Sequence, residues 1–77
     1  MDSLDRTRLA TDAAVYVAKS VSAYRLIRRL SQAELAERCG VTQQAINRIE
    51  QGDAMPSLKM LEKLAAAFEV APSELLP

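Results

Sequence analysis

The sequence predicts one all-α domain built from five helices. Helix-favouring residues, chiefly Ala, Leu, Glu, Arg and Gln, dominate the 77-residue composition, and runs of β-branched residues are absent. Apolar residues recur three and four positions apart, as they do on one face of a helix. Ser and Thr stand where such stretches begin and Gly where two of them end, which marks helix boundaries. We therefore expect residues 11–77 to form a single small domain.

The N-terminal part is expected to combine an arm with a long helix. Residues 1–10 show no hydrophobic period, so we predict that they form a flexible arm. Thr11 or Asp12 can cap the helix that follows, which should end near Arg28. Residues three or four positions apart share one side of this helix and should face the core. They are Val17, Val21, Tyr24 and Arg28.

A second apolar stripe runs along the same helix, roughly 140° from the core face at about 100° per residue. One small core offers too little cover for both sides, so one interpretation of the stripe is a homodimer surface or a surface for another protein. Scattered exposed residues, or cover from the arm and the C-terminal tail, would explain it as well. Two leucines near the C-terminus compete for the dimer role. The candidates are Tyr16, Ala23, Ile27, Leu75 and Leu76.

The next short helix is predicted to begin after Ser31. Ser31 and Glu34 form the S-x-x-E pattern of a capping box, so the helix should cover residues 32–38 or 32–39. Gly40 should end it, because glycine enters the left-handed conformation without strain. Its inward residues should be Leu35 and Ala36, and the single cysteine, Cys39, should be a small packing residue.

Thr42 can cap a third helix over residues 43–51, with Ile46 and Ile49 directed inward. Two helices that cross over a three-residue turn need a small residue at the contact, here Ala36, and glycine at the bend. The small residue, the glycine and the two inward isoleucines together predict a helix-turn-helix, whose second helix can enter the major groove of DNA.

Two more helices are predicted beyond the helix-turn-helix. Ser57 should cap a fourth helix, and Pro72 suits the first turn of a short fifth helix, residues 73–76. The expected buried face of the fourth helix is Leu58, Leu61, Leu64, Ala65 and Phe68.

The chain resembles the Cro/phage-repressor family of lambda-repressor-like helix-turn-helix domains. The resemblance rests on LSQAELAERCGVTQQAINRIEQG and PSLKMLEKLAAAFEV, with Arg25 ahead of them, and covers about residues 17–76. It implies a five-helix DNA-binding domain whose third helix reads duplex DNA, usually as a homodimer on a two-fold operator. Three departures are Arg29, which stands where the family commonly has glycine, Leu26 and Ile27, which stand where it usually has polar residues, and residues 53–55, which lack the usual basic side chains.

The resemblance and the chemistry of the third helix together suggest the DNA contacts. Glutamine can pair with adenine N6 and N7, and arginine with guanine O6 and N7. The alternative is that this face is an ordinary solvated surface. The predicted base contacts are Gln43, Gln44, Asn47 and Arg48. The predicted phosphate contacts are Gln32, Thr42, Gln51 and Lys59, and the family's structural ion pair falls on Arg25 and Glu50.

Composition restricts the other functions. The chain has no His and one Cys, which excludes an internal disulfide and a Cys/His zinc site, so we expect no metal, no cofactor and no enzyme. Ten basic residues balance ten acidic ones, which weakens non-specific affinity for DNA phosphates. No signal peptide or long uncharged apolar run is evident, so a cytoplasmic location is expected.

These observations predict a sequence-specific transcriptional regulator, a repressor that acts as a homodimer on double-stranded DNA. The alternative is an antitoxin or another interaction module, which would bind a partner protein through the first helix as well as DNA. The extra apolar stripe and the neutral charge motivate that alternative.

Overall fold

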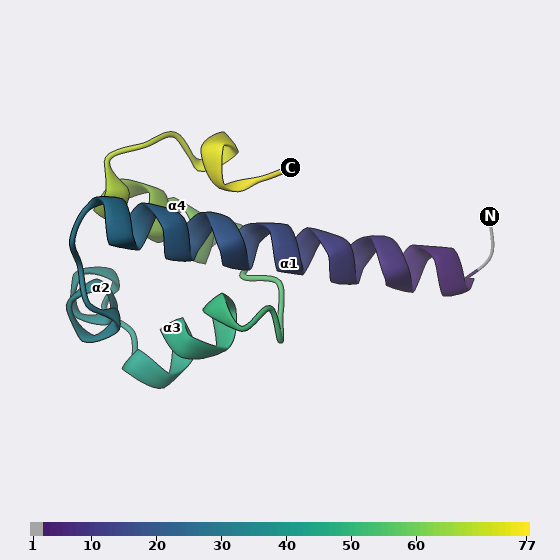
Figure 1. Ribbon diagram of the computed structural model, residues 1–77, viewed down its shortest axis with the longest axis horizontal. Helices are drawn as coiled ribbons and strands as arrows, with labels where there is room; N and C mark the ends of the chain where they lie inside the picture. Colours follow the sequence, from purple (N-terminus) through teal and green to yellow (C-terminus); the bar gives the residue numbers. More distant parts are fainter. Residues whose placement is uncertain (1–2) are drawn as a thin grey trace.

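The computed structural model describes the backbone of residues 3–77 and the side chains of residues 12–77. Within this range the chain forms four α-helices and one 3-10 helix, without a strand (Figure 1). No helix in the described part is long and apolar enough to cross a membrane. The elements are α1 (Ser3–Ile27), α2 (Gln32–Cys39), α3 (Gln43–Glu50), α4 (Leu58–Phe68) and η1 (Pro72–Leu75).

The prediction of five helices is confirmed in part: four are α-helices, and the last element is a 3-10 helix. Its bonds span three residues, from Glu74 N to Ala71 O at 2.9 Å and from Leu76 N to Ser73 O at 3.2 Å. Ala71 and Leu76 are both extended, so only four residues lie between them. That length accommodates the tighter 3-10 turn rather than a regular α-helix.

Helix α1 begins at Ser3, well before the expected start at Thr11 or Asp12. Residues 3–27 contain neither glycine nor proline, so nothing in the covalent chain interrupts the helix upstream of the potential cap. Figure 1 shows the N-terminal half of α1 extending past the other helices. Residues 1–2 and the side chains of residues 1–11 lie outside the described part, so a flexible arm over residues 1–10 stays a prediction.

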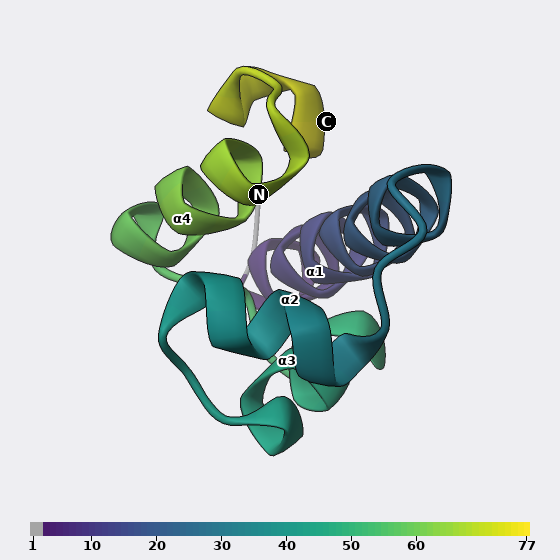
Figure 2. The same cartoon turned by 90° about the vertical axis from the view of Figure 1, so that its left-hand side faces the viewer.

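The core lies where α1, α2, α3, α4 and η1 meet. Figure 2, which looks along α1, shows α2 and α3 on one side of it and α4 with the C-terminal turn on another. All four helices and η1 contribute side chains that are fully buried, which is the close packing expected of a small domain. The largest are Phe68, Leu35, Ile46, Leu64, Leu75, Val17 and Val21.

Three residues differ from the sequence-based expectation of burial. Leu58 is 66% exposed because it is the first residue of α4, directly after the cap, where the helix has not yet reached the core. Leu75 was a candidate for a dimer surface, but it is fully buried within its own chain. Arg28 was expected on the core face, yet it is exposed.

The C-terminal part is fastened to α1 through Tyr24. Its ring stacks on Phe68 with centroids 5.8 Å apart, and its hydroxyl donates a hydrogen bond to Glu74 Oε2 at 2.6 Å. Arg28 Nε donates to Phe68 O at 2.7 Å, so this residue contacts the end of α4 from the surface. These contacts hold η1 over α1 on the side opposite to α3, which leaves the outer face of α3 uncovered.

Candidate nucleic-acid interface

Helix α2 begins and ends as the sequence predicts. Ser31 Oγ accepts a hydrogen bond from Glu34 N at 3.0 Å, and Glu34 Oε1 accepts one from Ser31 N at 3.0 Å, so the capping box is complete. The hydrogen bond from the backbone of Ser31, followed by one from its side chain, lowers the pKa of the Glu34 carboxyl group. Gly40 ends the helix with φ +67°, and a Cβ there would meet no atom within 4 Å. The bend therefore needs glycine for its backbone conformation and not for lack of space.

Helix α3 presents two different faces. Thr42 Oγ1 accepts from Ala45 N at 3.1 Å and fixes the start of the helix. Ile46 is fully buried and Ile49 is 8% exposed, which confirms that both isoleucines point inward. The side chains of Gln43, Gln44 and Arg48 are exposed on the outer face. Gln51 at the end of α3 and Lys59 in the first turn of α4 are also exposed.

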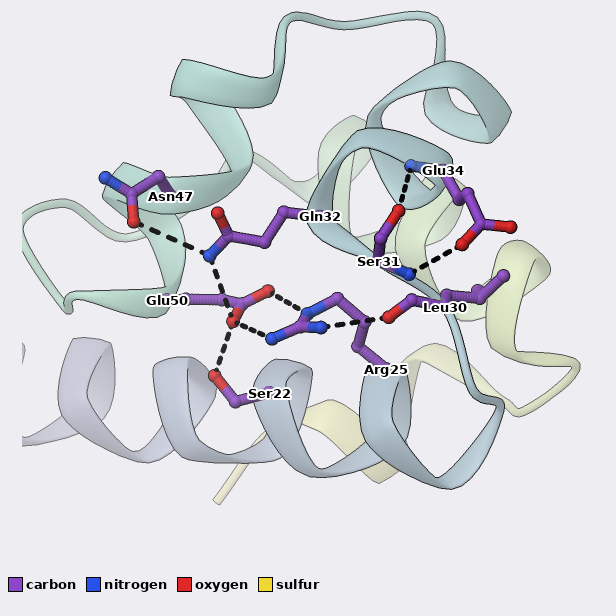
Figure 3. A network of polar contacts seen from close by, with 8 residues as sticks. All are labelled: Ser22, Arg25, Leu30, Ser31, Gln32, Glu34, Asn47 and Glu50. Atoms are coloured by element: carbon purple, nitrogen blue, oxygen red, sulfur yellow. Dashed lines mark hydrogen bonds and ion pairs between the residues drawn. The ribbon is translucent and has the colours of Figure 1, made fainter.

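An ion pair joins the inner side of α3 to α1. Arg25 Nε lies 2.7 Å from Glu50 Oε2, and Arg25 Nη2 lies 3.1 Å from Glu50 Oε1, so the contact is bidentate (Figure 3). The side chains of Arg25 and Glu50 are only 15% and 7% exposed. Ser22 Oγ donates to Glu50 Oε1 at 2.9 Å, and Arg25 Nη1 donates to Leu30 O at 2.9 Å. Sequence reasoning missed Ser22, although it stands three residues before Arg25 on the same side of α1.

Both members of this pair are charged in the folded protein. Burial opposes ionisation of Glu50, but hydrogen bonds from Arg25 and Ser22 outweigh it, so the pKa of the carboxyl lies below its usual value. The hydrogen bond to Glu50 likewise raises the pKa of Arg25 against the effect of burial. A partly buried, charge-assisted contact of this kind fixes the position of α3 relative to α1.

Gln32 and Asn47 extend the network from α2 to α3. Gln32 Nε2 donates to Glu50 Oε1 at 3.4 Å and to Asn47 Oδ1 at 3.5 Å, and both residues are half-buried (Figure 3). The sequence suggested a phosphate contact for Gln32 and a base contact for Asn47 but gave no sign that they meet. The two residues are 15 positions apart, beyond the reach of any periodic pattern.

A turn and a surface hollow are two further features of this region. Arg29, between α1 and α2, has φ +56°, so an arginine adopts the left-handed conformation in which glycine is usual.

An open and mainly apolar hollow of about 330 Å³ lies between α3 and the start of α4. Ala45, Ile49, Pro56 and Met60 line it together with Arg48, so the hollow is continuous with the outer face of α3.

Comparisons with known proteins agree with this geometry. The sequence model of the helix-turn-helix family HTH_3 matches residues 21–75. An uncharacterized HTH-type transcriptional regulator from Methanocaldococcus jannaschii is 45% identical over 47 residues, which cover 61% of this chain and 71% of that protein.

Two solved structures have the same fold at higher coverage. The restriction-modification controller protein C.AhdI from Aeromonas hydrophila is 31% identical with a TM-score of 0.77, over 80% of this chain and 94% of that one. The hypothetical transcription factor NHTF from Neisseria is 31% identical with a TM-score of 0.80, over 84% and 75% of the two chains. Since the family match spans all of α2, α3 and α4, the chain belongs to the helix-turn-helix family of Cro/C1-type, DNA-binding transcription regulators.

Proposed function

We propose that the protein is a repressor that binds a specific double-stranded DNA sequence as a homodimer. The observation that carries this proposal is the outer face of α3, where Gln43, Gln44 and Arg48 are exposed opposite the buried Ile46 and Ile49. A helix held from one side, with long polar side chains on the other, fits the major groove.

Each side chain of this face suits a particular base. Gln44 can pair with adenine through its amide, and Arg48, one turn later, with guanine O6 and N7; each bidentate pair discriminates by about 1–3 kcal/mol. Gln43 and Asn47 complete the proposed base contacts. The apolar hollow next to Arg48 can receive a thymine methyl group, which is the apolar signal of the major groove.

The four proposed phosphate contacts differ in how freely their side chains can reach the DNA backbone. Gln51 and Lys59 are exposed at the two ends of the surface and can reach the backbone of the duplex. Thr42 can still donate its hydroxyl hydrogen while its oxygen caps α3. Gln32 would have to turn its amide away from Glu50 to meet a phosphate. With few cations near the face and no net charge on the chain, we expect a weak dependence of affinity on salt.

The outer stripe of α1 supports the homodimer. Tyr16 is 47% exposed and Ile27 is 65% exposed, and Ala23 is exposed between them on the same side. Two copies of such a stripe can cover each other around a two-fold axis, as a symmetric operator requires. Leu76 is half-buried and remains a possible edge of this surface, whereas Leu75 is not.

The same stripe favours a second candidate function, an antitoxin or another module that binds a different protein. Sedimentation of the purified chain distinguishes the two. A homodimer at micromolar concentration that becomes a monomer in Ile27→Glu supports the repressor proposal. A wild-type monomer that binds DNA only with the product of a neighbouring gene supports the alternative.

Selection from a random duplex pool, followed by gel shifts on the selected sequence, tests the reading face. The variant Gln44→Ala with Arg48→Ala should lose sequence-specific binding and keep its unfolding midpoint, because both side chains are exposed. Ser73→Ala, exposed on η1, is the matched control and should bind like the wild type. Unchanged specific binding by the double variant would remove α3 from the role of reading helix.

A reporter gene placed behind the selected sequence tests the direction of regulation. Expression should fall when the wild-type protein is supplied and stay high with the double variant. A rise in expression with the wild type would make the protein an activator and leave the DNA-reading proposal intact.

A further inference from the structure

We propose that Glu50 and Gln32 hold the amide of Asn47 in one orientation, so that Asn47 offers DNA only hydrogen-bond donors. In this arrangement the oxygen of Asn47 faces the protein and its NH2 group is available to the duplex. Gln32 is then a positioning residue that acts through Asn47. The inference rests on the proposed function and adds the chemical class of group that Asn47 recognises, which is an acceptor atom of DNA.

The orientation starts at Glu50, whose carboxylate can only accept hydrogen bonds. Its Oε1 atom receives Ser22 Oγ at 2.9 Å and Arg25 Nη2 at 3.1 Å, and its Oε2 atom receives Arg25 Nε at 2.7 Å. The charged partner keeps the carboxylate ionised. Any amide that approaches Glu50 from α2 must therefore present its nitrogen.

Gln32 makes that approach. Its Nε2 atom lies 3.4 Å from Glu50 Oε1, whereas the flipped amide would place a carbonyl oxygen against the carboxylate. An NH2 group has two hydrogens, and the second points to Asn47 Oδ1 at 3.5 Å. Both distances are long, so each bond is weak. The order of donors and acceptors is nevertheless consistent from Glu50 through Gln32 to Asn47. Reversing either amide would place oxygen against oxygen or nitrogen against nitrogen.

Asn47 is the last residue of this hydrogen-bond relay, which runs from Glu50 through Gln32. Because its Oδ1 accepts from Gln32, its Nδ2 points away from the network, as Figure 3 shows. Recognition of adenine by asparagine needs both atoms, the oxygen for N6 and the nitrogen for N7. An amide whose oxygen is directed toward the protein instead presents its NH2 group, which can donate to guanine O6 and N7 or to a phosphate oxygen. Asn47 is therefore expected to disfavour adenine, whereas Gln44, whose amide is exposed, is not restricted.

Base preferences measured by gel shift test the relay on DNA. The sequence selected by the wild type is changed one base pair at a time, and the pair that Asn47 contacts is the one at which Asn47→Ala loses discrimination. The wild type should prefer guanine to adenine there by about five-fold or more. Gln32→Ala should reduce this ratio to about one and gain adenine binding, since the freed amide can rotate. Ser73→Ala should keep the wild-type ratio.

Two results would overturn the proposal on DNA. One is a wild-type preference for adenine at the pair that Asn47 contacts. The other applies where Asn47 discriminates at a base pair, and is a Gln32→Ala variant that binds every sequence more weakly with an unchanged preference at that pair, because Gln32 would then bind a phosphate directly.

Asn47→Asp distinguishes a base from a phosphate as the acceptor. This variant replaces the donor by an acceptor and should bind more weakly than Asn47→Ala in either case. Loss of the guanine preference at one base pair identifies a base, and weakening with unchanged base preferences identifies a phosphate. Binding by Asn47→Asp equal to that of the wild type would contradict donor-only recognition.

A measurement on the free protein separates this inference from the proposed function. The side-chain NH2 hydrogens of Gln32 should exchange with solvent more slowly than those of the exposed Gln43 and Gln44. Asn47→Ala should speed the exchange of Gln32 and leave Gln43 unchanged. If Gln32 exchanges as fast as Gln43 in the wild type, the relay is wrong even if the protein binds its operator. If it is protected but no specific sequence is selected, the proposed function fails instead.

Discussion

The inward and outward faces of α3 use polar side chains in opposite ways. Glu50, on the inner side, accepts hydrogen bonds from Ser22 and Arg25 of α1 and from Gln32 of α2. Gln44 and Arg48, on the outer side, are exposed, and their side chains make no hydrogen bond within the described residues. Within this eight-residue helix, the direction in which a polar side chain points decides its role. One that faces α1 stabilises the fold, and one that faces outward is available to a ligand.

This asymmetry should separate stability from DNA affinity. Removing a contact on the inner face changes the free energy of unfolding, because it leaves a cavity or an unpaired charge. Removing a side chain from the outer face changes that free energy by about 0.5 kcal/mol or less. A small domain of this length has a free energy of unfolding of only about 4–12 kcal/mol, so the inner substitutions should be easy to detect.

The largest effect on stability is expected from Ile46→Ala. Ile46 is fully buried, so the change removes apolar contacts and leaves a cavity that costs about 2–5 kcal/mol. Urea unfolding at pH 7 measures it, with Gln44→Ala as the outer-face control. If the alanine variant does not fold, Ile46→Val should still lose about 0.5–1.5 kcal/mol. Equal losses for Ile46→Val and Gln44→Ala would contradict the difference between the two faces.

Glu50→Ala should have the next largest effect, about 2–4 kcal/mol, because it leaves the guanidinium of Arg25 without its partner. The estimate lies slightly below that for a fully buried pair, since Arg25 remains 15% exposed. Denaturant unfolding of the variant and of Glu62→Ala, an exposed acidic residue of α4, gives the difference. A loss no larger than that of Glu62→Ala would show that the ion pair does not hold α3.

The pH dependence of stability provides a separate test of Glu50. Its folded pKa lies below the usual value of 4.5, so the folded state holds fewer protons than the unfolded state in that range. The stabilisation is complete above the unfolded pKa and is lost as pH falls through the folded pKa. Unfolding curves from pH 7 to pH 2 should therefore show a steeper loss for the wild type than for Glu50→Gln. Parallel curves would argue against a depressed pKa.

Gly40→Ala is expected to cost about 1–2 kcal/mol, the penalty for an L-residue in the left-handed conformation. Since a Cβ at Gly40 meets no atom within 4 Å, the whole cost should come from the backbone. Gly40→Asn should cost less, because asparagine tolerates this conformation better. Equal unfolding midpoints for the two variants would mean that the turn relaxes. The turn would then not fix the angle at which α3 presents its outer face.

The helix-turn-helix could be predicted from the sequence because its determinants are local. The capping box at Ser31, the glycine at Gly40 and the isoleucine pair of α3 each act within a few residues, and the structure has all of them. The ends of the chain were predicted less well. The start of α1 at Ser3 was missed because residues 1–10 show no hydrophobic period, and the burial of Leu75 depends on how η1 folds back over α1.

The polar network shows the same limit of prediction from local sequence signals within the site. A contact between Arg25 and Glu50 was expected from the family resemblance, and the pair is present. The meeting of Gln32 with Asn47 was not expected, because it depends on the crossing of α2 and α3 and on the direction of two amides. Periodicity assigns a residue to a face, but it does not specify which atom of an amide points outward.

Arg29→Gly should have the smallest effect, a gain of about 0.5–1 kcal/mol. Arg29 has φ +56°, and glycine removes a strain of about 1–2 kcal/mol in this conformation, while its greater freedom in the unfolded chain costs about 0.5–1 kcal/mol. Arg29→Ala is the matched control, because it removes the same charge and keeps the strain. Thermal unfolding should place the glycine variant above the wild type and the alanine variant at or below it. Because both variants lose one cation, they should change DNA affinity equally. A glycine variant no more stable than the alanine variant would show that this turn, unlike the one at Gly40, is not limited by its backbone conformation.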